Sequence, residues 1–188
     1  MPWSLPNVLT YFRIAMVPAV VAAFYIHGDA GRWLALVIFI AAGVTDFFDG
    51  YLARAWAQQS NLGRMLDPIA DKLLVAAVLL ALVHDGTISG VSFWAALIIL
   101  CREMLVSGLR EFLAEVRVSV PVSRLAKWKT TLQMVAIGFL IAGTAGDKVL
   151  PGTSMIGTGM LWIAAILTLY TGYDYLRVGL RHVIGDGR

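Results

Sequence analysis

Four aspartates lie close together in a chain that is otherwise largely apolar: Asp46, Asp49, Asp67 and Asp71. The first two are three residues apart and the last two are four apart, so on helices each pair shares one face. Carboxylates grouped inside a membrane repel one another unless cations hold them, and such charges are usually there for function. Because carboxylate oxygens suit Mg²⁺ and Mn²⁺, the spacing predicts a site for two divalent cations at the ends of adjacent helices.

The composition is that of an integral membrane protein. Of the 188 residues, 59% are apolar and 14% are charged, whereas a soluble domain carries about 25% charged residues. The mean hydropathy is +0.77. The length suits one domain over residues 1–188, since no repeat or linker indicates a second. The first apolar run has neither a basic flank nor a cleavage site, so no signal peptide is expected.

Apolar runs separated by turn residues predict an all-α bundle of six transmembrane helices. The expected spans are Asn7–Ile26, Trp33–Ala53, Leu66–Val83, Val91–Leu113, Thr130–Ala145 and Met155–Tyr175. The first begins with an amphipathic segment, from Asn7 to Arg13, that we expect to lie at the membrane interface.

The basic residues predict the orientation of these helices. They gather at the N-terminus, in the second and fourth connections and at the C-terminus, whereas the other connections hold only Arg32 and Lys148. The positive-inside rule therefore places both termini in the cytoplasm. Charges also interrupt the second, third and fourth helices near their cytoplasmic ends. This pattern predicts a polar cavity, open to the inner face, that would fit a substrate with a polar head and lipid tails.

The aspartates belong to a longer pattern, D-x2-D-G-x2-A-R-x8-G-x3-D-x3-D, which also fixes Gly50, Ala53, Arg54 and Gly63. It resembles the signature of the CDP-alcohol phosphotransferases, membrane enzymes that move a phosphatidyl or related group from a CDP-linked donor to an alcohol. The resemblance extends over the chain in length and helix count. It implies that the four aspartates bind two divalent metal ions, that Asp71 is the catalytic base, and that the protein is a homodimer.

The same resemblance implies a binding site for the CDP donor at Asp46, Gly50, Ala53, Arg54, Gly63 and Asp67. The small residues Gly50 and Ala53 leave room for the cytidine nucleotide, and Gly63 lets helices approach closely. Arg54 most simply pairs with a carboxylate or a phosphate. Two bound metals would neutralise the donor diphosphate, and a carboxylate near the acceptor hydroxyl would accept its proton.

A second cluster of charged residues is basic. Arg102 and Arg110 lie eight residues apart, near one face of the fourth expected helix, and Lys127 opens the fifth. Such groups converge naturally on a phosphate, although topology and anionic lipid also place basic residues at cytoplasmic helix ends. A role in the site is preferred for Arg102, because it is embedded in an apolar run beside Glu103. Lys72 is embedded too and receives no role.

Three segments resemble the bacterial members of the family that use CDP-diacylglycerol and sn-glycerol 3-phosphate: Leu5–Arg13, Arg102–Glu111 and Lys127–Gln133. On this resemblance Arg102, Arg110 and Lys127 bind the acceptor phosphate. Thr10 and Arg13 are expected to border the nucleotide or the lipid head. The resemblance also implies the bacterial cytoplasmic membrane, with the active site facing the cytoplasm, and no nucleic-acid partner.

Two alternatives to this acceptor and this chemistry stay open. The first keeps the family and changes the acceptor to inositol phosphate, to serine, or to phosphatidylglycerol in cardiolipin synthesis. The basic cluster argues against serine and less firmly against inositol phosphate. The second is a cation transporter that uses the carboxylate cluster, which would move ions without releasing CMP and would not require the glycine and alanine positions.

Overall fold

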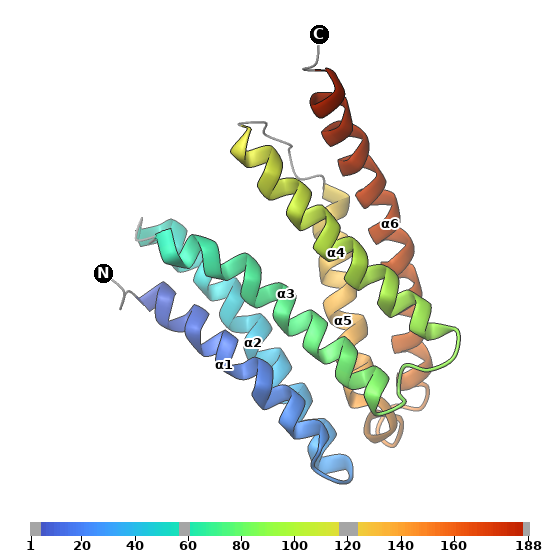
Figure 1. Ribbon diagram of the computed structural model, residues 1–188. Coiled ribbons are helices and arrows are strands. Elements are labelled where there is room, and N and C mark those ends of the chain that lie inside the picture. Colours follow the sequence, from blue (N-terminus) through green and yellow to red (C-terminus); the bar gives the residue numbers. More distant parts are fainter. Residues whose placement is uncertain (1–4, 57–60, 117–123, 186–188) are drawn as a thin grey trace.

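The computed structural model of the protein describes the backbone of residues 5–56, 61–116 and 124–185, and the side chains of residues 8–45, 63, 65–116, 125 and 128–177 (Figure 1). Within these ranges the chain is all-α, with six helices and no strand. The helices are α1 (Leu5–Phe24), α2 (Asp29–Trp56), α3 (Asn61–His84), α4 (Ser92–Glu115), α5 (Arg124–Asp147) and α6 (Thr153–Gly185).

Each expected span corresponds to one helix, although α1 ends at Phe24 and α4 begins at Ser92, slightly inside the spans expected for them. Several helices extend well beyond the apolar run that predicted them. At about 1.5 Å per residue, the 28 residues of α2 reach about 42 Å and the 33 residues of α6 about 50 Å. A hydrocarbon core of about 30 Å needs only about 20 residues. Hydropathy finds the part of a helix that suits lipid, whereas backbone hydrogen bonding continues through polar residues. The segment from Asn7 to Arg13 belongs to the continuous helix α1, and its place at the interface stays a prediction.

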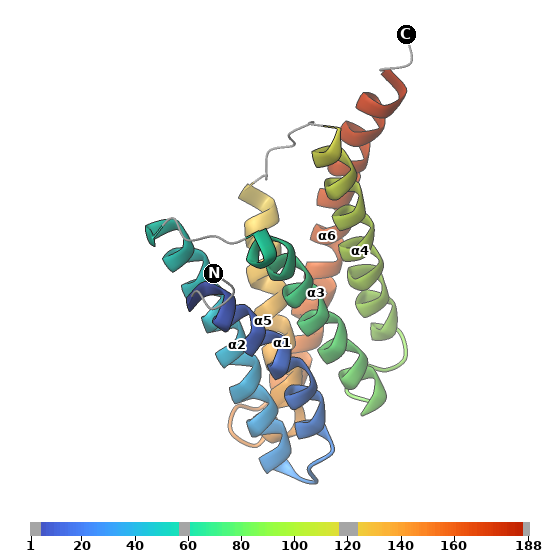
Figure 2. The same cartoon turned by 60° about the vertical axis from the view of Figure 1, so that its left-hand side comes forward.

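The helices form two groups of three (Figures 1 and 2). In the first group α1 packs against both α2 and α3, and in the second α6 packs against both α4 and α5. The main junction between the groups is the contact of α2 with α5, and α3 makes smaller contacts with α4 and α5. Fully buried apolar side chains fill both groups and their junction, among them Leu79, Leu82, Ile99, Ile137 and Leu161.

The outer surface of the bundle is also apolar. Large side chains such as Val37, Leu80 and Ile166 are more than half exposed, and an apolar surface of this extent marks contact with lipid or another protein. Two helical segments, Ser92–Glu115 and Thr153–Arg177, are long and apolar enough to cross a membrane. These features are those of a membrane protein.

At the end of the bundle where α2 begins, hydrogen bonds from Arg32 link α2 to α5 and to the connection between α3 and α4. Helix α5 is kinked at Gly143, where φ is +45° and ψ is −127°. Beside the kink, Arg32 Nη1 donates hydrogen bonds to the carbonyl oxygens of Leu140, at 3.3 Å, and Ile141, at 3.2 Å. Arg32 Nη2 donates to Asp85 Oδ2 at 2.7 Å. The positive φ favours glycine at position 143, and a Cβ there would displace the Arg32 guanidinium from its present position.

Candidate active site between the two helix groups

A cavity of about 1240 Å³ lies between the two groups of helices. Its walls include Asp67 and Asp71 near the start of α3, and Leu150 and Thr153 between α5 and α6, so the cavity extends along most of the bundle. Most of the lining is apolar. Charged and amide groups enter it at Arg13, Asp67, Asp71, Lys72, Glu103, Arg110 and Gln133. A long apolar cavity with polar groups gathered among a few residues suits an amphipathic ligand.

The two aspartates of α3 are held by two polar residues of α1. Thr10 Oγ1 donates a hydrogen bond to Asp67 Oδ1 at 2.5 Å, and Arg13 Nη1 donates to Asp71 Oδ1 at 2.9 Å. Thr10 and Arg13 are fully buried, whereas the Asp71 side chain is 50% exposed. Their spacings, i to i+3 on α1 and i to i+4 on α3, put each pair on one helix face. Arg13 can therefore fix the orientation of a carboxylate that remains open to the cavity.

The remaining residues of the acidic pattern are described in part. Asp46, Asp49, Gly50, Ala53 and Arg54 all belong to helix α2, but their side chains lie outside the described residues. Gly63 is buried in the first turn of α3.

Metal binding by the aspartates therefore stays a prediction. Among the described side chains, no group of three or more His, Cys, Asp or Glu comes together. Asp67 and Asp71 contribute carboxylate oxygens one helical turn apart, which is the donor chemistry that Mg²⁺ or Mn²⁺ prefers.

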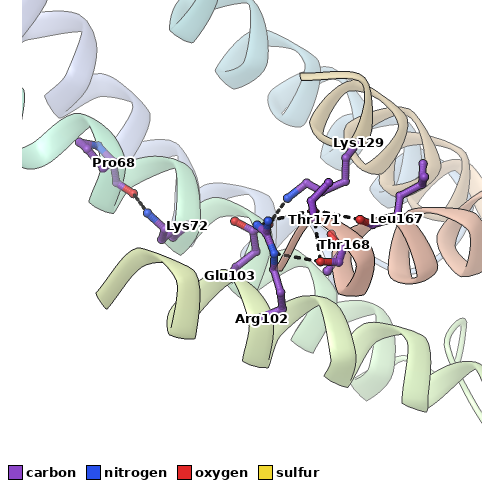
Figure 3. Close-up of polar contacts among 8 residues, drawn as sticks. All are labelled: Pro68, Lys72, Arg102, Glu103, Lys129, Leu167, Thr168 and Thr171. Carbon is purple, nitrogen blue, oxygen red and sulfur yellow. Dashed lines mark hydrogen bonds and ion pairs between the residues drawn. The ribbon is translucent and has the colours of Figure 1, made fainter. Parts of the chain in front are cut away.

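Arg102 joins α4 to α6 (Figure 3). Its Nε donates to the Thr168 carbonyl oxygen at 3.0 Å, and its Nη2 donates to Thr171 Oγ1 at 2.9 Å. The third contact is with Glu103 Oε1, 3.3 Å from Nη1. The stem packs on Gly172, where a Cβ would stand 3.0 Å from Arg102 Cγ. Arg102 does not line the cavity. Its assignment to the acceptor phosphate stays a prediction, and these contacts favour a role in packing.

Glu103 also pairs with a second basic side chain. Lys129 of α5 donates a hydrogen bond from Nζ to the same Glu103 Oε1 that Arg102 contacts (Figure 3). Lys129 is 3% exposed. Glu103 lines the cavity, so this shared ion pair ties α4 to α5 at the cavity wall.

The other predicted phosphate ligands lie apart from this cluster. Arg110, on α4, is exposed and lines the cavity. Lys127 belongs to α5, but its side chain is outside the described residues. Two cavity residues were missed from the sequence, Lys72 and Gln133. Gln133 is 3% exposed, and its Oε1 has no hydrogen-bond partner among the described residues. The sequence signal for Gln133 was its position one helical turn beyond Lys129.

An apolar helical bundle with carboxylates and cations around a cavity suits a membrane enzyme. A sequence profile of the family described as CDP-alcohol phosphatidyltransferase matches residues 3–170. The chain therefore belongs to the CDP-alcohol phosphatidyltransferase family, as its acidic pattern predicted. Enzymes of this family use divalent metal ions.

Curated relatives of the chain share one name, CDP-diacylglycerol–glycerol-3-phosphate 3-phosphatidyltransferase. The protein of Rickettsia bellii is 49% identical over 174 residues, which cover 93% of this chain and 94% of the relative. That of Cereibacter sphaeroides is 43% identical over 221 residues, covering 97% and 98%. That of Haemophilus influenzae is 41% identical over 184 residues, covering 95% and 94%.

Proposed function

We propose that the protein transfers the phosphatidyl group of CDP-diacylglycerol to sn-glycerol 3-phosphate, giving phosphatidylglycerol phosphate and CMP. The observation that carries this proposal is similarity to enzymes of that name along nearly the whole chain, at 49% identity in one and 43% in another. The cavity supports it, since an apolar lining suits diacylglycerol chains and the polar residues suit the two phosphate-bearing groups.

In the proposed mechanism Asp71 is the general base. It accepts the proton of the C1 hydroxyl of glycerol 3-phosphate. The hydroxyl oxygen then forms a bond to the phosphorus next to diacylglycerol, and the bond from that phosphorus to CMP breaks. The buried Arg13 donates a hydrogen bond from Nη1 to Asp71 Oδ1 at 2.9 Å, so the carboxylate keeps one orientation toward the acceptor.

Asp46, Asp49, Asp67 and Asp71 would hold two divalent cations, Mg²⁺ or Mn²⁺. When bound, these supply positive charge that stabilises the donor diphosphate and the departing phosphate of CMP. Gly50, Ala53, Arg54 and Gly63 would border the nucleotide together with Asp46 and Asp67. Arg110, which lines the cavity, would contact the acceptor phosphate. The same role is proposed for Lys127, whereas the contacts of Arg102 with α6 and Glu103 favour packing over the phosphate role expected from the sequence.

In its proposed setting the chain is a single domain over residues 1–188 in the bacterial inner membrane. All six helices would cross the bilayer, and both termini and the active site would face the cytoplasm. The support is the gathering of Lys and Arg on one side of the expected spans and the apolar outer surface. We also propose that the protein is a homodimer in contact with membrane lipid.

The test is product formation by purified protein in detergent micelles. With CDP-diacylglycerol, labelled sn-glycerol 3-phosphate and Mg²⁺ or Mn²⁺, we expect labelled phosphatidylglycerol phosphate and equimolar CMP, and chelation of the metal should stop both. Inositol phosphate, serine and phosphatidylglycerol serve as competing acceptors. A faster reaction with any of them would overturn the assigned acceptor. In sealed lipid vesicles, ion flux without CMP release would overturn the enzyme class.

The substitution Arg102→Gln tests whether Arg102 binds the acceptor phosphate or packs α4 against α6. Because its donors are directed at α6 and Glu103, we expect the free energy of unfolding to fall by roughly 1.5–3 kcal/mol, the range for a charge-assisted hydrogen bond. The KM for glycerol 3-phosphate should stay near the wild-type value. Thermal unfolding and steady-state kinetics measure the two effects. A rise in that KM alone, with a loss of roughly 10- to 150-fold in kcat/KM and unchanged stability, would instead place Arg102 at the acceptor phosphate.

A further inference from the structure

Three cations beside the cavity each have a carboxylate partner. Arg13 pairs with Asp71, and both Arg102 and Lys129 pair with Glu103. A charged side chain away from bulk water is costly unless it is paired. Each of these three positive charges therefore has a carboxylate of the protein itself as its partner.

Lys72 differs from these three. It follows Asp71 on α3 and lines the same cavity. Its Nζ lies 3.4 Å from the Pro68 carbonyl oxygen, one turn back on its own helix (Figure 3), which is longer than an ordinary N–H···O hydrogen bond. Among the residues that the structure describes, Lys72 has no carboxylate partner. Figure 3 shows it on α3, apart from the Arg102, Glu103 and Lys129 cluster.

The charges around Lys72 favour an anion at this position. Lys72 and Glu103, the partner of Lys129, line the same cavity. Glu103 is one negative charge shared by two cations, so that cluster keeps a net positive charge. An anion in the cavity would offset this positive charge and give Lys72 a charged partner.

We propose that Lys72 binds a substrate phosphate. This inference rests on the proposed function, in which both substrates carry phosphate and react beside Asp71. A lysine suits the task because its compact charge on a flexible stem can follow a phosphate as the reaction proceeds. Two sources of phosphate qualify: the monoester of the acceptor and the diphosphate of the donor.

The experiment compares Lys72→Gln, Lys72→Arg and wild type, with the KM measured separately for glycerol 3-phosphate and CDP-diacylglycerol. The matched control is Lys148→Gln, which removes a lysine that is 67% exposed and pairs with Asp29 at 2.6 Å, near the start of α2. We expect Lys72→Gln to raise one KM roughly 10-fold, the lower end for a charge-assisted hydrogen bond. Lys72→Arg should restore most of the affinity, and Lys148→Gln should change neither KM.

The outcomes identify the source of the phosphate or reject the inference. A higher KM for glycerol 3-phosphate alone assigns Lys72 to the acceptor, and a higher KM for CDP-diacylglycerol alone assigns it to the donor. Both values within twofold of wild type would overturn the inference.

Binding provides a second readout that does not depend on turnover. The substrate whose KM rises should stabilise Lys72→Gln against heat less than it stabilises the wild-type protein. Equal stabilisation of the two proteins, or none of either, would also overturn the inference. A wild-type protein that binds these ligands but releases no CMP would instead reject the proposed function.

Discussion

Asp71→Asn is expected to lower kcat by roughly 10²- to 10⁴-fold, the contribution of a positioned general base. Asparagine has the size of aspartate but cannot accept the acceptor proton. Binding of CDP-diacylglycerol should be largely retained, because the donor contacts assigned to α2 and to Asp67 remain. Single-turnover release of CMP and a separate measurement of donor binding would resolve these two effects.

The structure adds a control to this experiment. Asp71 is also the partner of the fully buried Arg13, so loss of its charge should reduce stability as well as turnover. The variant must therefore be assayed below its own unfolding temperature. Asp29→Asn, at the opposite end of the bundle, is the matched substitution and should leave kcat unchanged. Near-wild-type turnover in Asp71→Asn would contradict the assignment of Asp71 as the base. The variants Asp49→Ala and Asp67→Ala each remove a proposed metal ligand, so they should lose metal binding as well as activity.

Glu103→Gln is expected to give the largest loss of stability, about 3–5 kcal/mol, as found when one partner of a buried ion pair is removed. The substitution leaves Lys129 buried without a counter-charge and takes an acceptor from Arg102. Unfolding in detergent micelles measures the effect. Glu115→Gln, an exposed substitution on the same helix, should change stability by less than about 0.5 kcal/mol.

A second substitution tests the cause of that loss. If the unpaired Lys129 charge is responsible, Lys129→Met added to Glu103→Gln should recover part of the stability, and the double-mutant cycle should give a large coupling energy. Additive losses from the two substitutions would contradict the ion pair as a stabilising contact.

The sequence alone was sufficient to predict where the helices lie and which aspartates of α3 share a helix face. Hydropathy located every helix, because a long apolar run must be helical to satisfy its backbone groups in lipid. Spacing placed Asp67 and Asp71 on one face of α3, because residues four apart on a helix always share a face. The helix ends were less well predicted, since polar residues continue α2 and α6 past the apolar runs.

Tertiary structure decided which partner each side chain meets. At 3.6 residues per turn, eight residues advance a helix by two turns and roughly 80°, so Arg102 and Arg110 need not face the same neighbour. Arg102 faces α6, and Arg110 lines the cavity. Likewise, the i to i+3 spacing of Thr10 and Arg13 predicts a shared face, but only the packing of α1 on α3 brings that face onto the aspartates. Periodicity fixes directions around one helix axis, whereas the rotation of that helix against its neighbours depends on the packing of the whole core.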